Sequence, residues 1–300
     1  MTHPRIGFIG IGLMGHGMAK NLVAKGFPLA FMVHRDRSRT ADLLAAGAKE
    51  AKTPADLARA SDIVILCVTG SPQVEENVFG ADGLLGAAHS GLTVIDTSTA
   101  EPGSTSKIRE ALAAKGATFV DAPLARTPKE AEEGRLNTMV GADDATFARL
   151  KPVFAAYCEN IFHVGPPGAG HTLKLVNNFM ALSIVASIAE AFAVAAKAGV
   201  KLDKLFEVVS QGAANSTIFQ MMGGGAVAGD FARMKFSIQN AAKDLRYYTH
   251  LAESLPIASF LGESVHQSFE LAVGLGLGER MVPSMIEAQE KLNQMQIVKR

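Results

Sequence analysis

The chain has 300 residues and a formal net charge of +0, with 29 basic and 29 acidic side chains, so nothing in its charge points to nucleic acid or an anionic membrane. Hydrophobic residues make up 48% and charged residues 19%, which argues against disorder. Two cysteines without metal-type spacing and an N-terminus without a signal-peptide pattern lead us to expect a reduced, cytoplasmic protein.

The first half of the chain alternates short apolar runs with helical patterns. We predict helices at 13–26, 38–48, 54–61 and 104–115, and strands at 5–10, 29–35, 62–68, 92–98 and 118–123. Further strands at 137–142 and 160–165 extend the same sheet. Continuous apolar strands that alternate with helices indicate a parallel sheet covered on both faces, which is an α/β domain.

Residues 10–15, GIGLMG, form a GxGxxG motif directly after the first strand, where the first helix begins. In this context Gly10 permits a tight turn, Gly12 leaves room for a pyrophosphate, and Gly15 lets the helix pack closely on the strand. Free N–H groups at the helix N-terminus then face the phosphate charge. We expect a dinucleotide here, in contact also with Leu13 and Met14. The alternative is a turn with incidental glycines.

Other candidate cofactor residues follow the next strands. An acidic residue at the end of the second strand would bind the ribose 2′-hydroxyl of NAD, but this chain has His34 and Arg35 there. These two basic residues favour NADP, with NAD possible; alternatively, Arg35 is an ordinary solvated charge. Val68 and Thr69 lie where the strand at 62–68 ends, and Thr99 follows the strand at 92–98. Ligands of open α/β sheets bind outside such strand ends, although the polar residues at 96–99 could instead cap a helix.

The pattern changes after a breaker cluster, PPGAG, at residues 166–170. We therefore predict two domains: residues 1–165 form the α/β domain, and residues 166–300 form an all-α domain. The apolar stretch 179–198 approaches transmembrane length but contains Glu190 and Lys197, so we expect a buried helix of a soluble protein, with a membrane span as the alternative. Excess apolar helix surface indicates a homodimer or homotetramer.

Four motifs occur in register: GFIGIGLMGHGMAKNL at the start, IDTST at 95–99, DAP…EGRL within 121–136, and GAGHTLKLVNN at 168–178. Together they resemble the β-hydroxyacid dehydrogenase family, which includes 3-hydroxyisobutyrate dehydrogenase and tartronate semialdehyde reductase. The resemblance covers most of the chain. It implies a dinucleotide-binding Rossmann domain at residues 1–165 and a helical substrate and oligomerisation domain at residues 166–300, joined by a long helix. It implies a reversible hydride transfer between a nicotinamide cofactor, NADP or NAD, and a small β-hydroxy acid or its semialdehyde.

The resemblance also assigns residues on the long helix and beyond it. Lys174 matches the family's lysine and acts as acid/base, because a proton must reach the substrate oxygen as hydride arrives. Asn177 and Asn178 share its helix face; Asn178 orients the lysine or the substrate oxygen, and Asn177 borders the substrate. Lys243 lines the cofactor or the substrate. The alternatives are a solvent-facing Lys174 and a Lys243 that only pairs with Asp244.

The segment after the D-x-P motif departs from the family. Most members have Ser-Gly-Gly where this chain has Ala125, Arg126 and Thr127, which look like the Gly-Arg-Thr of sulfolactaldehyde reductase, a member that acts on a three-carbon sulfonate. A guanidinium fork suits a carboxylate, sulfonate or phosphate, so we expect Arg126 and Thr127 to bind the anionic end of the substrate beside Ala125. The alternative is a salt bridge from Arg126 to Glu130, Glu132 or Glu133.

Other functions fit the sequence less well. The histidines form no HExxH motif and no cluster with carboxylates at metal spacing, so we expect no metal. Imine reduction on the same fold and a non-catalytic nucleotide-binding module remain alternatives, and the lysine at position 174 argues against both.

Overall fold

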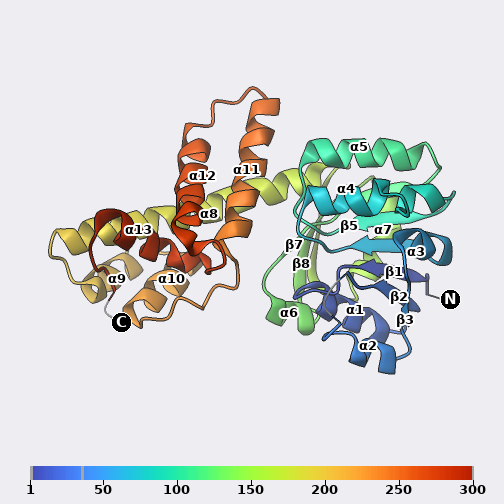
Figure 1. Ribbon diagram of the computed structural model, residues 1–300, viewed down its shortest axis with the longest axis horizontal. Helices are drawn as coiled ribbons and strands as arrows, with labels where there is room; N and C mark the ends of the chain where they lie inside the picture. Colours follow the sequence, from blue (N-terminus) through green and yellow to red (C-terminus); the bar gives the residue numbers. More distant parts are fainter. Residues whose placement is uncertain (1–2, 35–36, 299–300) are drawn as a thin grey trace. The chain divides into compact units, whose positions relative to one another are not determined.

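The computed structural model describes residues 3–34 and 37–298, and the chain divides into two compact units, residues 1–174 and 175–300. The division falls inside helix α8 (Ala169–Lys197), which is one unbroken helix (Figure 1). The first unit holds an α/β sandwich, and the described part of the second unit is helical apart from one isolated bridge between Ser237 and Met281.

The sheet of the first unit follows the strand order β3-β2-β1-β4-β5-β6-β8-β7, with β9 paired to β8. Its first six members are parallel, in the doubly wound order 3-2-1-4-5-6 that is typical of dinucleotide-binding domains. The strands are β1 (Ile6–Ile9), β2 (Leu29–Met32), β3 (Lys49–Glu50), β4 (Ile63–Leu66), β5 (Thr93–Asp96), β6 (Thr118–Asp121), β7 (Leu124–Ala125), β8 (Leu136–Gly141) and β9 (Cys158–Gly165).

The far edge of the sheet differs from the all-parallel arrangement that the sequence pattern predicts. Strand β8 runs antiparallel to β6 and β7, and parallel to β9. The connection from β7 to β8, residues 126–135, is shorter than a parallel crossover needs, so the chain turns back on itself. This return places the segment around Arg126 beyond the end of β7.

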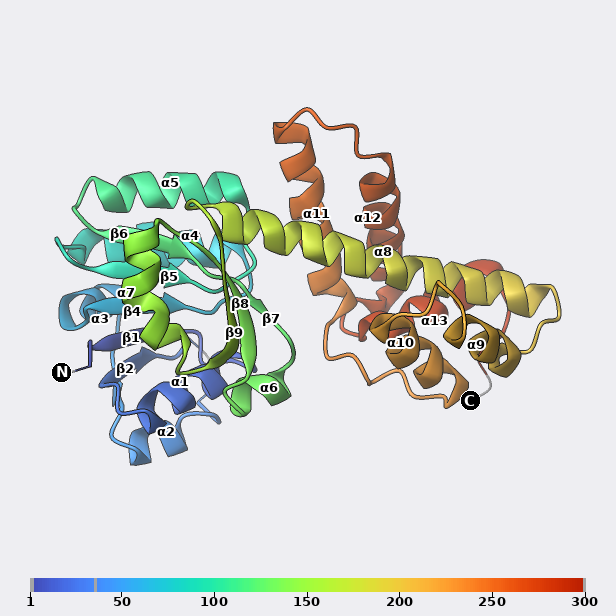
Figure 2. The same ribbon diagram turned by 180° about the vertical axis from the view of Figure 1, so that it is seen from behind.

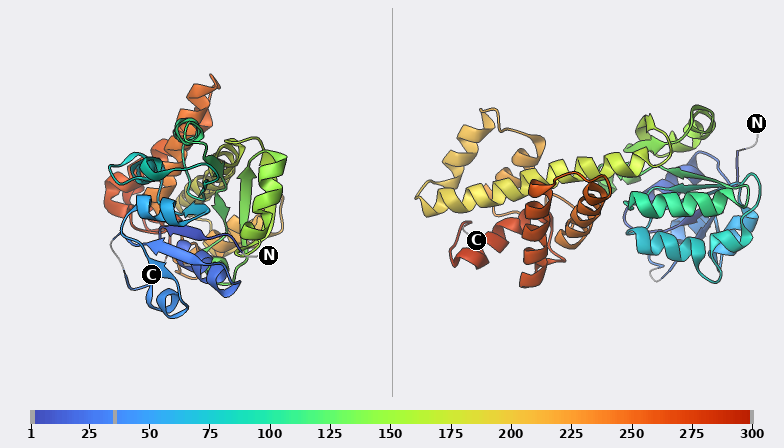
Figure 3. Two further views of the ribbon diagram at one scale, coloured as in Figure 1. Left: turned by 90° about the vertical axis from the view of Figure 1, so that its right-hand side faces the viewer. Right: turned by 90° about the horizontal axis from the view of Figure 1, so that it is seen from above.

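Helices cover both faces of the sheet, as the alternating pattern predicts. On one face α1, α2, α6 and α7 pack on side chains such as Ile63 and Ile65; on the other α3, α4 and α5 pack on Val64 and Leu66. Figure 3 shows α4 and α5 side by side. The helices are α1 (Gly15–Ala24), α2 (Ala41–Ala45), α3 (Pro54–Ala60), α4 (Ser71–Phe79), α5 (Pro102–Ala113), α6 (Pro128–Glu132) and α7 (Asp144–Phe154).

The second unit packs its helices around one apolar core. Helix α8 contributes Leu182, Val185, Ala189 and Phe192, whose spacing of three and four residues defines one helix face. Helices α11 and α12 run side by side (Figure 2). The remaining bounds are α9 (Leu202–Ser210), α10 (Thr217–Val227), α11 (Ile238–Ser254), α12 (Phe260–Ala272) and α13 (Met285–Asn293).

Helix α8 is only partly the buried helix that the sequence suggests. Among the described residues it is the one helix long and apolar enough to cross a membrane by length and composition, and 33% of its most apolar window is buried inside the chain. Its buried face packs on the second unit's core, whereas Met180 and Val194 are 62% and 64% exposed.

Candidate active site

The candidate site begins at one edge of the sheet. Strands β1, β2, β4, β5 and β6 are parallel, so their carboxyl ends meet at the same edge. The order reverses between β1 and β4, and ligands of open α/β sheets bind outside the strand ends at such a point. The loops after these strands carry most of the residues singled out in the sequence.

The glycine loop after β1 has the geometry that a dinucleotide needs. Gly10 has φ of +105°, and a Cβ there would lie 2.1 Å from the carbonyl oxygen of Cys67. A Cβ on Gly15 would lie 1.9 Å from the carbonyl oxygen of Gly10. A Cβ on Gly12, by contrast, would meet no atom of the protein within 4 Å. The first and third glycines are thus required by the fold, and the second leaves open space for a phosphate at the helix N-terminus.

The other candidate cofactor residues line the same edge of the sheet. Leu13 is 59% exposed beside the glycine loop, and Met14 is half-buried just before α1. His34 is exposed after β2, whereas Arg35 lies outside the described residues. Thr69 is exposed after β4, and the Val68 N–H donates to the Ser98 hydroxyl (3.0 Å), which ties the loop after β4 to the loop after β5.

Thr99 is half-buried next to Ser98, in the loop between β5 and α5. The turn that carries it is fixed by its neighbours. The Thr97 hydroxyl donates to the carbonyl of Leu66 (2.7 Å), and the Ser98 N–H donates to the Asp96 carboxylate (2.9 Å). Thr99 is therefore presented at the sheet edge by a rigid loop.

Arg126 occupies an unusual backbone position directly after β7. Its φ is +81°, in the left-handed region that favours glycine and costs other residues about 1–2 kcal/mol. Its guanidinium does not pair with Glu130, Glu132 or Glu133: Nη1 donates to the carbonyl of Arg135 and to the carboxylate of Glu159 on β9. This contact lowers the pKa of Glu159. The alternative of a salt bridge to one of these sequence neighbours is therefore wrong, and Arg126 pairs with a residue far away in the chain.

Helix α6 follows at once and fixes the loop that carries Ala125 and Arg126. Thr127 is its N-cap residue, and both its backbone N–H and its hydroxyl donate to Glu130. Helix α1 packs against α6 so closely that a Cβ on Gly17 would lie 2.4 Å from the backbone of Ala131. The helix that starts at the glycine loop therefore supports the helix that starts at Thr127.

A histidine reinforces the packing of α1. Nδ1 of His16 lies 2.5 Å from Glu132 on α6, and Nε2 lies 3.0 Å from Asp42 on α2. Burial lowers the pKa of His16, but the hydrogen bonds to these two carboxylates outweigh burial and raise it above its ordinary value. His16 thus links the elements that follow the glycine loop, the second strand and the Arg126 segment.

Lys174 stands just beyond the first turn of α8, and the sheet fixes that turn. The Asp121 carboxylate, at the end of β6, accepts the N–H groups of Gly168 (2.7 Å) and His171 (2.9 Å). It caps the helix from a distant strand and complements its N-terminal dipole. A Cβ on Gly170 would lie 2.4 Å from the Met139 carbonyl, so only glycine allows this approach. The helix that carries Lys174 therefore begins at the same edge of the sheet as the glycine loop.

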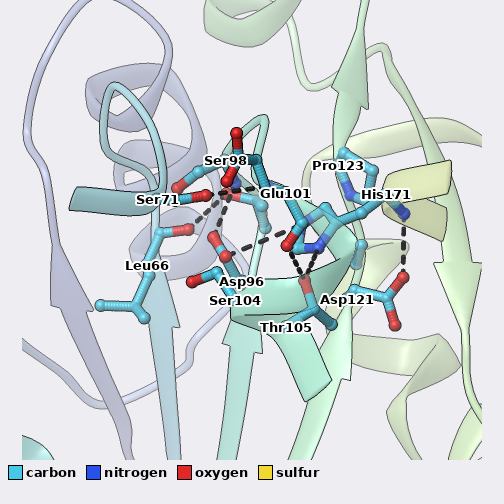
Figure 4. A network of polar contacts seen from close by, with 12 residues as sticks. Leu66, Ser71, Asp96, Ser98, Glu101, Ser104, Thr105, Asp121, Pro123 and His171 are labelled. Atoms are coloured by element: carbon cyan, nitrogen blue, oxygen red, sulfur yellow. Dashed lines mark hydrogen bonds and ion pairs between the residues drawn. The ribbon is translucent and has the colours of Figure 1, made fainter. Parts of the chain in front are cut away.

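A second set of buried polar groups surrounds this turn (Figure 4). His171 is fully buried; its Nδ1 lies 2.6 Å from the Thr105 hydroxyl, and its Nε2 lies 3.6 Å from Oδ2 of Asp96. Burial raises the pKa of Asp96, and the nearby His171 opposes that rise. The contacts of His171 could not be predicted from the sequence, although it stands three positions before Lys174 in the GAGHTLK motif.

The second unit places Asn178 and Lys243 around one buried carboxylate. Asp244 accepts a hydrogen bond from Nδ2 of Asn178 (2.6 Å), and Nζ of Lys243 lies 2.9 Å from its other oxygen. Nζ of Lys243 also lies 5.1 Å from the ring centre of Tyr247. Asn177 is exposed next to Asn178 and donates to it. Asp244 thus fixes the amide of Asn178, a role that the sequence did not reveal.

Within residues 3–34 and 37–298, no group of three or more His, Cys, Asp or Glu side chains is arranged to hold a metal ion. The first unit, in contrast, fits a dinucleotide. Its open Gly12 position, the N-terminus of α1 and the polar loops after β4 and β5 all lie at the switch point of the sheet.

Comparison with known proteins agrees with this geometry. The family described as the NAD binding domain of 6-phosphogluconate dehydrogenase matches residues 5–165, and the NAD-binding domain of NADP-dependent 3-hydroxyisobutyrate dehydrogenase matches residues 168–288. The chain is 32% identical to 2-(hydroxymethyl)glutarate dehydrogenase of Eubacterium barkeri over 289 residues, which are 96% of this chain and 95% of that protein. It is 34% identical to 2-hydroxy-3-oxopropionate reductase of Escherichia coli (strain K12) over 253 residues, 84% of this chain and 86% of that protein.

Among solved structures, 3-hydroxyisobutyrate dehydrogenase from Salmonella typhimurium superposes with a TM-score of 0.81 at 29% identity, covering 94% of this chain and 99% of that one. The fold, the glycine loop and these matches agree. The chain belongs to the β-hydroxyacid dehydrogenase family, and it is an NAD(P)-dependent oxidoreductase that acts on CH–OH groups.

Proposed function

We propose that this protein interconverts a small anionic β-hydroxy acid and its semialdehyde, with Lys174 as the acid/base and Arg126 as the anchor for the anion. The relatives named above act on short substrates of this kind, as their names state. The proposal covers a carboxylate or a sulfonate at the anionic end, because a guanidinium binds both.

One observation carries the proposal, namely the capping of α8 by Asp121. This contact fixes the start of α8 at the carboxyl end of β6, and Lys174 follows one turn after His171. The same sheet edge carries the glycine loop, where the cofactor that supplies or accepts the hydride binds. A lysine held there can give a proton to the carbonyl oxygen during reduction and take it back during oxidation.

The supporting residues have distinct roles in the proposal. Asn178, one helical turn beyond Lys174, is oriented by Asp244 and hydrogen-bonds the substrate oxygen or the lysine. Asn177 and Lys243 border the substrate. On the first unit, Thr127 and Ala125 flank Arg126 at the start of α6, so a rigid backbone presents the guanidinium.

In this proposal the anion competes with Glu159 for the guanidinium of Arg126. Its partner Glu159 lies at the surface, with 30% of the Arg126 side chain and 45% of the Glu159 side chain exposed. Exposed ion pairs of this kind contribute little to stability, because solvent screens them. An incoming carboxylate or sulfonate can therefore displace Glu159 from the guanidinium, or share the guanidinium with it, at little cost in free energy.

We also propose a preference for NADP over NAD. His34 and Arg35 stand where an NAD-specific protein carries an acid, and a basic pair there suits the additional 2′-phosphate. Arg35→Ala should therefore weaken NADPH binding much more than NADH binding, as measured by fluorescence titration with both dinucleotides. Equal effects on the two would contradict this assignment.

We further propose a soluble, cytoplasmic homodimer or homotetramer. Helix α8 exposes Val176, Met180, Ile184 and Val194 opposite its buried face. An apolar strip of this length is typical of a surface that another protein covers. In this protein a second copy of the same chain would cover it.

The experiment that tests the function measures initial rates with NADPH and NADH. The panel contains succinic, tartronate and methylmalonate semialdehydes and sulfolactaldehyde, with wild type beside Lys174→Ala and Lys174→Arg. Removal of a general acid typically costs about 10²–10⁴-fold in kcat, and arginine retains the charge but cannot release its proton. Both variants should therefore lose most of their kcat. The control Lys197→Ala, at the far end of α8, should retain the wild-type kcat. Full activity of Lys174→Ala would overturn the mechanism.

A further inference from the structure

The buried set around His171 has no role in the chemistry proposed above, yet it occupies the turn that precedes Lys174. His171 and Asp96 are 0% and 1% exposed as side chains. Within the described residues, neither Nε2 of His171 nor Oδ2 of Asp96 has a hydrogen-bond partner. Buried polar atoms without partners are costly, so their juxtaposition at 3.6 Å requires an explanation.

The number of protons available to the three side chains explains it. The Thr105 hydroxyl lies 2.6 Å from Nδ1 of His171 and 3.1 Å from the Glu101 carbonyl, and it has one proton to donate. If that proton points to Nδ1, the neutral imidazole carries its own proton on Nε2, facing Asp96. If it points to Glu101, Nδ1 must itself be protonated and donate to Thr105. In the second case Nε2 faces Asp96 favourably only when a further proton lies between them.

The first arrangement points the Nε2 proton at the Asp96 carboxylate, and both side chains are buried. At 3.6 Å the contact is an electrostatic attraction rather than a hydrogen bond, and burial makes that attraction stronger than it would be in water. Thr105, on α5, fixes the opposite side of the ring. The backbone of His171 is bound independently by Asp121.

We propose that His171 is a positioning residue for the reaction. Held between Asp96 and Thr105, its side chain fixes the rotation of the first turn of α8 about the helix axis, and hence the direction in which Lys174 points. This inference rests on the proposed role of Lys174. The hydrogen bonds from the backbone to Asp121 determine where α8 begins. The side chain of His171 determines which face of α8 is directed towards the sheet edge.

The same contacts reach the loops expected to hold the cofactor. Asp96 uses Oδ1 to accept the N–H of Ser98 (Figure 4). The Ser98 hydroxyl in turn accepts the N–H of Val68. Asp96 thus joins the loops after β4 and β5 to the helix that carries Lys174. Loss of His171 should loosen the helix turn without removing any group that touches the substrate.

Two pairs of variants separate positioning from general destabilisation. His171→Leu keeps similar bulk without donor or acceptor, whereas His171→Gln places an amide nitrogen near the position of Nε2. Thr105→Val removes the hydroxyl contact, and Thr105→Ser retains it. Misplacement of a catalytic group by about 1 Å can cost about 10²-fold in rate. We expect kcat to fall about 10–100-fold in His171→Leu and less in Thr105→Val, and to be largely retained in the Gln and Ser variants.

The measurement combines steady-state kinetics with hydrogen exchange of the peptide covering residues 166–176, which needs no turnover. In His171→Leu, exchange should become faster there, while KM and the dinucleotide Kd change less than about threefold, because no binding group is removed. If His171→Leu fails to fold, Thr105→Val and Thr105→Ser are compared in its place. A wild-type kcat together with wild-type exchange in His171→Leu would overturn the inference, and so would the same result in Thr105→Val when His171→Leu does not fold.

The outcome also separates this inference from the proposed function. If Lys174→Ala is inactive and His171→Leu is normal, only the positioning role is lost. If Lys174→Ala retains wild-type kcat, the proposed function is wrong, and the positioning role falls with it.

Discussion

Replacement of Arg126 by glycine should separate stability from activity at one position. The residue has φ of +81°, so glycine relieves about 1–2 kcal/mol of backbone strain, although it adds about 0.5–1 kcal/mol of unfolded-state entropy. Arg126→Ala relieves no strain. Both changes remove the same surface pair with Glu159, so its loss cancels when the two variants are compared. The glycine variant should therefore be more stable than the alanine variant by about 0.5–1 kcal/mol.

The kinetic effect should not follow that order. A hydrogen bond to a charged group contributes about 1.5–3 kcal/mol, so both variants should raise KM for the anionic aldehyde about 10–100-fold. Arg126→Lys should lie between them and wild type, because lysine retains the charge but lacks the fork. Glu159→Gln is the matched control: it removes the competing carboxylate and should leave KM unchanged or lower it by up to about fivefold.

The assay is thermal unfolding of each variant beside steady-state rates over the substrate panel. A difference of 1 kcal/mol corresponds to about 2–4 °C in a chain of this size, so the Gly and Ala variants are distinguishable. A KM of Arg126→Gly within twofold of wild type for every anion would contradict the role of Arg126 as the anion anchor. A loss of activity that follows the melting temperatures would also contradict it, because Arg126 would then be a structural residue.

The remaining predictions concern four other positions. Gly12→Ala should leave the melting temperature within about 2 °C of wild type and weaken dinucleotide binding at least about 10-fold. Gly15→Ala, whose Cβ would lie 1.9 Å from a carbonyl oxygen, should instead lower the stability of the fold. Thermal unfolding measures the stability of both variants, and titration measures their dinucleotide binding. The raised pKa of His16 stabilises the fold fully below about pH 6.5, and this contribution is lost as pH rises through the folded-state pKa. Unfolding of His16→Gln from about pH 6 to 9 should lack that decline, and a slope equal to wild type contradicts it. Met180→Glu, on the exposed face of α8, should shift the oligomer towards monomer in light scattering; an unchanged mass excludes this face as the interface.

Several features of the fold could be predicted from the sequence because local patterns encode them. Continuous apolar strands, each followed by a helix, predicted the parallel core of the sheet, and the structure confirms it for β1 to β6. The GxGxxG motif predicted a strand–helix turn with space beside Gly12, and that space is present. Both signals depend on residues close together in the chain. The motifs in register also identified the family, which the comparisons confirm.

Contacts between residues far apart in the chain were decided only by the tertiary structure. The sequence offered three nearby glutamates to Arg126, but the return of the chain through β8 and β9 brings Glu159 to it instead. No local sequence pattern predicted that Asp121 caps α8, or that His171 lies between Asp96 and Thr105. The sequence by itself determined most of the helices and strands and the glycine loop, because propensity, periodicity and turn chemistry act over a few residues. The structure decided which charges meet, because that depends on how the strands are ordered in space.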